Sequence, residues 1–195
     1  MSGSRKMVST SDFLKEAILD TQNTIRAIDT KLGAFLAALV LPFSLLGRAW
    51  AHISSICTID PPWIGILLSI LFFSLWILAI ACITLGLAAI GNPARHIKSG
   101  TAGESQFYAG GLFSLQIADA FLNRKSVISK VSLEEYLSSL PSTKEEIEKQ
   151  LAFEKLKTAY IRDIKIYRLQ AGYRIAICWV ATGASIFLIS KFATS

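Results

Sequence analysis

The sequence predicts an all-α protein: a membrane helix bundle with three transmembrane helices and a helical cytosolic region. Just over half of the 195 residues are apolar and only 17% are charged, which is rare in a soluble domain of this size. The stretch Pro62 to Ile90 contains no Asp, Glu, Lys, Arg or His. As a helix it would be about 43 Å long, more than the roughly 30 Å of bilayer hydrocarbon. The remaining residues separate into apolar and charged segments, which defines the other elements.

The N-terminal segment 1–31 predicts a cytosolic amphipathic helix that begins near Thr10 or Ser11, because both residue types are good N-caps. We expect this helix to continue into the first transmembrane helix, 32–50. That segment is short for a span, and Pro42 is expected to kink it. Arg48 and Trp50 complete it, with the cation reaching toward the headgroups and the indole in the interface.

The second transmembrane helix is predicted over 62–90. It follows the sequence Asp60-Pro61-Pro62, a turn signal that cannot lie inside a helix, and it stops at Gly91-Asn92-Pro93. Residues 92–170 are then the helical cytosolic region. An apolar segment within it, 107–122, has the spacing of an amphipathic helix.

Two capping boxes are predicted in the second half of the cytosolic region, at Ser132–Glu135 and at Ser142–Glu145. The second box opens a long helix that continues to Phe192 and contains the third transmembrane helix, 172–191. Apolar residues spaced three or four apart predict the packed face of this helix. They are Phe153, Leu156, Tyr160, Ile164, Tyr167, Ala171 and Ile175.

The distribution of Lys and Arg predicts the orientation of the three spans. Residues 1–31 and 92–174 carry 18 of the 20 basic residues, and only Arg48 and Lys191 fall on the other side. Because cytoplasmic flanks of membrane helices are enriched in Lys and Arg, we expect the N-terminus and the central region to be cytoplasmic.

Residues for catalysis are scarce. The two histidines, His52 and His96, lie on opposite predicted sides of the membrane, and no phosphate-binding loop, nucleophile motif or metal-binding motif is present. The cysteines Cys57, Cys82 and Cys178 have no metal-ligand spacing. We therefore expect no enzyme, no metal, and no DNA or RNA partner.

The cytosolic region instead carries a basic surface that suits an anion. The candidate ligand-binding residues are Arg95, Lys98, Arg124, Lys125, Arg162 and Lys165 for a phosphate, with Tyr108 for stacking on a base. Lys130, Lys155, Lys157 and Arg168 add to the same charge. Anionic lipid headgroups are the alternative partner for such juxtamembrane cations.

The order of these elements resembles the transmembrane effectors of the Pycsar anti-phage system. The similarity covers about residues 15–190, almost the whole chain. It rests on Asp29-Thr30-Lys31, Asn92-Pro93, Tyr108-Ala109-Gly110-Gly111-Leu112-Phe113, Leu133-Glu134-Glu135-Tyr136-Leu137 and the helix from Gln150 to Arg174. The chain departs from the family pattern at Gly110-Gly111, where bulkier aromatic residues are typical.

The resemblance implies a function that composition does not. According to the resemblance, the cytosolic region 92–170 is a sensor for a cyclic pyrimidine mononucleotide, cCMP or cUMP, made by a partner cyclase. The spans then impair the bacterial inner membrane, which gives abortive infection. A homo-oligomer is expected, and small residues would let its helices pack closely: Gly65, Gly86, Ala88, Gly183 and Ala184. A small channel or transporter subunit and a membrane-anchored scaffold protein are the alternatives.

Overall fold

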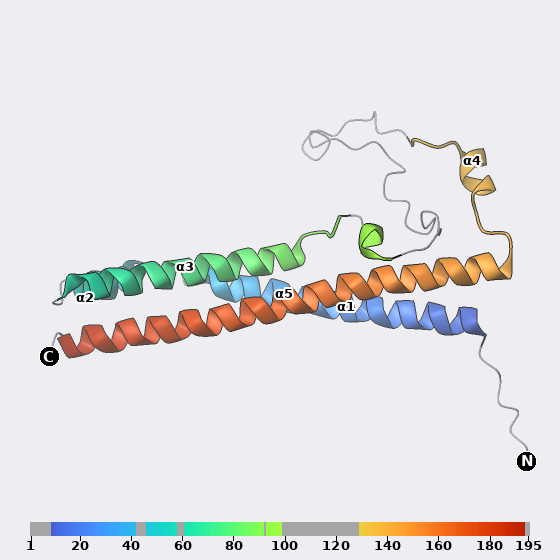
Figure 1. Ribbon diagram of the computed structural model, residues 1–195. Helices are drawn as coiled ribbons and strands as arrows, with labels where there is room; N and C mark the ends of the chain where they lie inside the picture. Colours follow the sequence, from blue (N-terminus) through green and yellow to red (C-terminus); the bar gives the residue numbers. More distant parts are fainter. Residues whose placement is uncertain (1–8, 42–45, 58–60, 92, 99–128, 194–195) are drawn as a thin grey trace, which may run out of the picture. The chain divides into compact units, whose positions relative to one another are not determined.

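The computed structural model describes residues 9–41, 46–57, 61–91, 93–98 and 129–193, and every regular element in these ranges is a helix (Figure 1). This confirms the predicted all-α class for the part of the chain described. The elements are α1 (Thr10–Val40), α2 (Leu46–Ile56), α3 (Pro62–Leu87), the 3-10 turn η2 (Pro93–His96), α4 (Leu133–Ser138) and α5 (Lys144–Ala193).

The chain divides into two compact units. The first falls within Met1–Asn23 and Ile90–Ile161, and the second within Thr24–Ala89 and Arg162–Ser195. Both α1 and α5 therefore contribute residues to each unit, while α2 and α3 belong to the second unit alone.

Two helices are long and apolar enough to cross a membrane, α3 and α5. Only 17% of the residues in the most apolar stretch of each are buried inside the chain, so these stretches are not enclosed core helices. The predicted first span, 32–50, is not one helix among the described residues, because α1 ends at Val40 and α2 begins at Leu46. Pro42 falls between them in the sequence, and proline supplies no backbone N–H to continue a helix.

In the second unit, α3 and α5 pack side by side in opposite directions (Figure 1). The buried face of α3 includes Gly65, Ala79 and Gly86, which lie at multiples of seven residues from one another. A repeat of seven is the spacing of helices that wind around each other with their side chains interlocked. The buried face of α3 therefore has the spacing of a helix that packs along its length against its neighbours, with Gly65 against α2 and Gly86 against α1.

Glycines allow the helices of the second unit to approach closely. A Cβ atom on Gly65 would lie 2.3 Å from the carbonyl oxygen of Ile56, so α2 and α3 touch there through their backbones. Cβ atoms on Gly172 and Gly183 would meet the side chains of Ile83 at 2.4 Å and Phe72 at 3.0 Å. Glycines predicted to serve an oligomer thus serve contacts within one chain.

The remaining small residues proposed for helix packing differ in their exposure. A Cβ atom on Gly86 would meet the side chain of Leu32 at 3.0 Å, so this glycine also packs inside the chain. Ala88 and Ala184 are exposed.

The apolar core of the second unit has two parts. The larger joins α1, α3 and α5 through Ile28, Leu32, Leu39, Ala79, Ile83 and Ala176. The smaller joins α2 to α5 through Ile53, Ile56 and Ile186, with Leu68, Phe72 and Phe73 of α3 packed against it. Every helix of the unit is therefore held by buried side chains, α2 included.

Helix starts in the first unit follow capping chemistry. The Ser9 hydroxyl accepts a hydrogen bond from the backbone N–H of Asp12, so α1 begins at the residue after it, Thr10. The predicted box at Ser132 is confirmed, since its hydroxyl and the Glu135 carboxylate exchange bonds with each other's backbone N–H groups.

The capping box at the start of α5 lies one residue later than the sequence predicted. The N-cap is Thr143, whose hydroxyl accepts from the N–H of Glu146 at 3.2 Å. The Glu146 carboxylate accepts from the N–H groups of Thr143 and Ser142 in return. Glu145, expected in that role, instead pairs with Lys149 one helical turn on, at 2.8 Å.

The predicted packed face of α5 is wrong at two of its members, because Leu156 is 55% exposed and Tyr167 is 71% exposed. The buried positions include Leu151, Thr158, Lys165 and Gly172, each seven residues after the last. Apolar spacing alone misses this face because half of these residues are polar. Their burial is compensated, since Thr158 donates to carbonyls of its own helix and Lys165 pairs with Asp29 of α1.

Candidate phosphate-binding site

The turn η2 presents cations in the first unit. Pro93 is buried, while Arg95, His96 and Lys98 are exposed. The turn is closed by a hydrogen bond from the N–H of Ile97 to the carbonyl of Ala94, at 3.2 Å. The buried proline and the closed turn therefore leave two of the predicted ligand-binding residues, Arg95 and Lys98, exposed to solvent.

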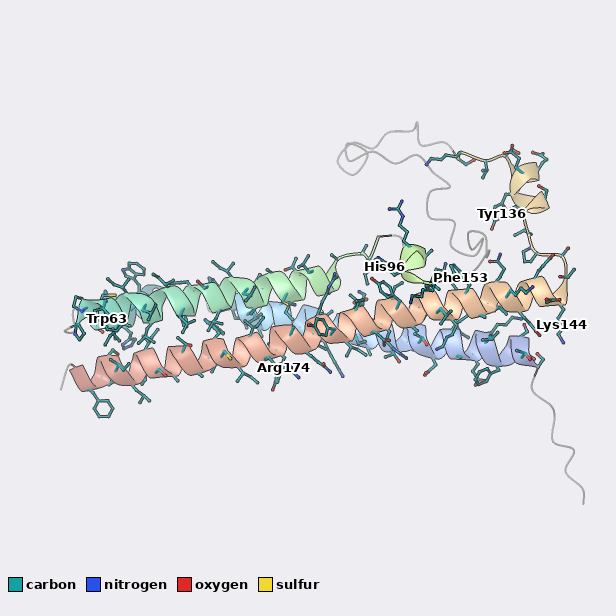
Figure 2. The ribbon with its side chains drawn as sticks, in the orientation of Figure 1. Trp63, His96, Tyr136, Lys144, Phe153 and Arg174 are labelled. Carbon is teal, nitrogen blue, oxygen red and sulfur yellow. The ribbon has the colours of Figure 1, made fainter. Side chains whose placement is uncertain are left out.

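His96 fixes this turn against α5. Its ring stacks on the ring of Tyr160, with 4.8 Å between centroids and 11° between planes. Figure 2 labels His96 on the turn η2. Parallel stacking covers one face of the imidazole and leaves the edges, which carry the ring nitrogens, able to bind an anion. Tyr160 was predicted only as part of a packed stripe, and the signal that was available is its position among the basic residues of α5.

Two lysines of the basic surface point inward. The Lys155 ammonium donates to the carbonyl of Ala17 at 2.8 Å and to the hydroxyl of Thr21. Lys157 is 3% exposed and pairs with the buried carboxylate of Glu154 at 2.5 Å. These two cations stabilise the first unit and are not presented to a ligand.

The candidates in the second unit are also engaged. Lys165 is 7% exposed and pairs with Asp29 of α1. Arg162 pairs with its neighbour Asp163, with 2.8 Å between nitrogen and oxygen. Arg168 donates to the carbonyl of Leu85, at 2.5 Å, near the end of α3. Each of these side chains has a structural partner that a phosphate would have to replace.

The other three predicted ligands, Tyr108, Arg124 and Lys125, lie outside the described residues, as does the predicted helix over 107–122. The structure therefore brings together Arg95 and Lys98 on one turn of the first unit, and Arg162 and Lys165 on one face of α5 in the second.

The side chains of the exposed turn are chemically suited to an anion. Within the described part of the chain, Arg95 and Lys98 have no acidic partner, and their charges face solvent. A guanidinium, an ammonium and a stacked imidazole together provide several N–H donors, which match the oxygens of a phosphate. The same described residues contain no group of three His, Cys, Asp or Glu side chains able to hold a metal ion.

Comparison of the chain with protein-family models, with curated proteins and with solved structures gives no match.

Proposed function

We propose that this chain is a three-pass membrane effector that responds to a cyclic pyrimidine mononucleotide, cCMP or cUMP, and then impairs the bacterial inner membrane. The N-terminus and the central region are cytoplasmic in this proposal, and the nucleotide comes from a partner cyclase. Support for it comes from the resemblance to Pycsar transmembrane effectors and from the arrangement of α5.

The observation that carries the proposal is that one helix, α5, both contacts the candidate phosphate-binding turn and contains a segment able to cross a membrane. α5 is a single helix of 50 residues, and its first half bears Tyr160, on which the cation-bearing turn η2 stacks. Its second half is apolar enough to cross a membrane. A ligand on η2 therefore acts next to the same helix that enters the bilayer.

A ligand shifts such a protein only if it binds one arrangement better than the other. The phosphate of the nucleotide is assigned to Arg95 and Lys98, because Lys165 and Arg162 already pair with Asp29 and Asp163. The nucleotide is an activating ligand and no cofactor is required.

Calorimetry of the detergent-solubilised protein against cCMP, cUMP, cAMP and cGMP tests the proposal. We expect binding of at least one pyrimidine nucleotide and much weaker binding of the purine nucleotides. Absence of binding by all four would refute the nucleotide-gated function.

A matched pair of variants then locates the site. Arg95→Glu with Lys98→Glu should abolish binding, because it reverses both exposed charges of the turn. Lys15→Glu with Lys144→Glu makes the same change in net charge at exposed residues elsewhere in the first unit and should leave binding unchanged. Equal losses in both would indicate a general electrostatic effect and would argue against a site at η2.

A further inference from the structure

Residues of α1 and of α2 contact α5 at the same offset in sequence. In α1, the ring of Phe35 packs against Tyr173 with 6.0 Å between centroids. In α2, a ring nitrogen of His52 lies 2.9 Å from the hydroxyl of Ser190. Both contacts join residues that are 138 apart in sequence. Because α5 is one uninterrupted helix from Tyr173 to Ser190, Phe35 of α1 and His52 of α2 follow the same helix in the same direction.

The same segment follows α3 along its whole length in the opposite direction. The side chain of Leu32 packs against Gly86, near the end of α3. The carbonyl of Leu39 is bonded by Trp76 in the middle, and Ile56 meets Gly65 near the start. The segment 32–56 has nearly the length of α3, and at helical rise it would measure about 38 Å against roughly 30 Å of hydrocarbon.

A break inside a bilayer leaves backbone groups that must find partners. Leu39 is the second-last residue of α1, so no backbone N–H of that helix is available to donate to its carbonyl. The indole N–H of Trp76 donates to it at 2.9 Å, and this side chain is 8% exposed. The bond thus satisfies one carbonyl at the end of α1 without water.

We propose that residues 32–56 form one interrupted membrane crossing, in which the hydrogen bond from Trp76 to Leu39 joins the end of α1 to α3 and the close contact of Ile56 with Gly65 joins α2 to α3. This inference rests on the three-pass topology proposed above and moves the outer end of the first crossing from Trp50 to Ile56. It makes α2 a separate half-crossing, held to α5 by His52 and Ser190 and to α3 at Gly65.

Cysteine accessibility tests the position of α2. In a chain whose native cysteines are replaced by alanine, Ala51→Cys places a thiol on the exposed face of α2, and Pro61→Cys places one in the exposed turn before α3. A thiol in hydrocarbon does not ionise and does not react. In permeabilised vesicles, we expect a charged maleimide to label Ala51→Cys at least about tenfold more slowly than Pro61→Cys. Equal rates would overturn the interrupted crossing.

Two tryptophans of the second unit provide a matched test of the hydrogen bond. The ring of Trp179 stacks on that of Trp76, with 6.5 Å between centroids and 19° between planes. The buried N–H of Trp179 has no acceptor among the described residues. Trp76→Phe and Trp179→Phe therefore make the same change in ring size, but only the first removes a bonded donor.

Hydrogen exchange of the full-length variants in lipid nanodiscs reads out the difference. In Trp76→Phe we expect exchange in Leu36–Val40 and in α2 to become about tenfold faster, because the Leu39 carbonyl loses its partner. Trp179→Phe should leave both segments unchanged, and peptides from α5 report whether each variant is folded. Equal effects of the two variants on α2, or no effect of Trp76→Phe, would contradict the assigned role of the bond.

The two proposals fail separately. Neither the labelling nor the exchange measurement contains a nucleotide, so absence of nucleotide binding leaves their outcomes unaffected. A reactive Ala51→Cys would overturn the interrupted crossing while leaving the calorimetry unchanged.

Discussion

The contacts that α5 makes with α1 differ in kind from those it makes with α3. Toward α1, lysines reach across: Lys155 to Thr21 in the first unit and Lys165 to Asp29 in the second. Toward α3, most contacts are made by glycine and aromatic rings, as at Gly172 and Trp179, and Arg168 adds one hydrogen bond to a backbone carbonyl. One helix face with a single seven-residue spacing therefore serves both polar and apolar packing.

The difference shows where specificity resides. Apolar side chains on α3 can slide past one another at modest cost, whereas an ion pair with one buried member, Lys165, is satisfied in only one register. Lys165 and Asp29 thus define the alignment of α1 with α5, and the small residues of α3 determine how closely the helices approach. The predictions below test this division, starting with the largest expected effect.

Removing one member of the ion pair should have an asymmetric result. Asp29→Asn leaves a buried ammonium without its carboxylate, and we expect a loss of about 3 kcal/mol in the free energy of unfolding. Lys165→Met should cost only about 1 kcal/mol, because the Asp29 side chain is 39% exposed and keeps contact with water. Denaturant titration in detergent micelles measures both.

The double variant separates the pair from its parts. Asp29→Asn combined with Lys165→Met should be more stable than Asp29→Asn alone, since no buried charge remains. Additive losses would show that the two side chains act independently and that the ion pair does not align α1 with α5.

Glycines test the close approach of helices in the second unit. Gly65→Ala places a methyl group against the Ile56 backbone, which cannot move aside as a side chain would. We expect a loss of about 2 kcal/mol. Gly33→Ala in α1 is the matched control, because nothing lies within 4 Å of its added Cβ. There the substitution should stabilise the helix by about 1 kcal/mol. Thermal unfolding of the two variants should therefore shift in opposite directions.

The sequence was informative where burial is apolar. The segment 62–90 has no charged residue, and α3 occupies Pro62–Leu87 of it. The hydrogen bond from Trp76 to the Leu39 carbonyl was not predicted, because a hydropathy pattern does not show which side chain can satisfy a carbonyl on a neighbouring helix. The face of α5 was missed for a similar reason, since Lys165 is buried only because Asp29 lies opposite.

The candidate site shows the same limit. Charge alone grouped Arg95 and Lys98 with Lys155 and Lys157, although the last two cations point into the first unit. Their partners lie on α1 and on the preceding turn of α5, and a count of basic residues cannot distinguish them from the exposed pair. Arg95 and Lys98 are distinguished by their position on a turn that is held to α5 by the stacking of His96 on Tyr160. This contact joins distant parts of the sequence.

The smallest expected effect concerns the start of α5, where contacts are fully exposed. Hydrogen bonds from the backbone N–H groups of Thr143 and Ser142 hold the pKa of Glu146 below its ordinary value of 4.5. A lowered pKa means that the folded helix start favours the carboxylate. Its contribution is therefore complete above about pH 4.5 and is lost as the pH falls through the lowered value.

Hydrogen exchange of residues 144–149 measured from pH 6 to pH 3, and corrected for the intrinsic pH dependence of exchange, checks this sign. Protection should fall on acidification in the native chain. Glu146→Gln keeps an acceptor oxygen without a titrating proton, so its protection should lose most of this pH dependence. The pair of Glu145 with Lys149 remains in that variant and lowers the pKa of Glu145 through their hydrogen bond, which leaves a residual slope. A slope unchanged by Glu146→Gln would assign the acid sensitivity to Glu145 and its lysine, and the capping box would then contribute nothing measurable to the start of α5.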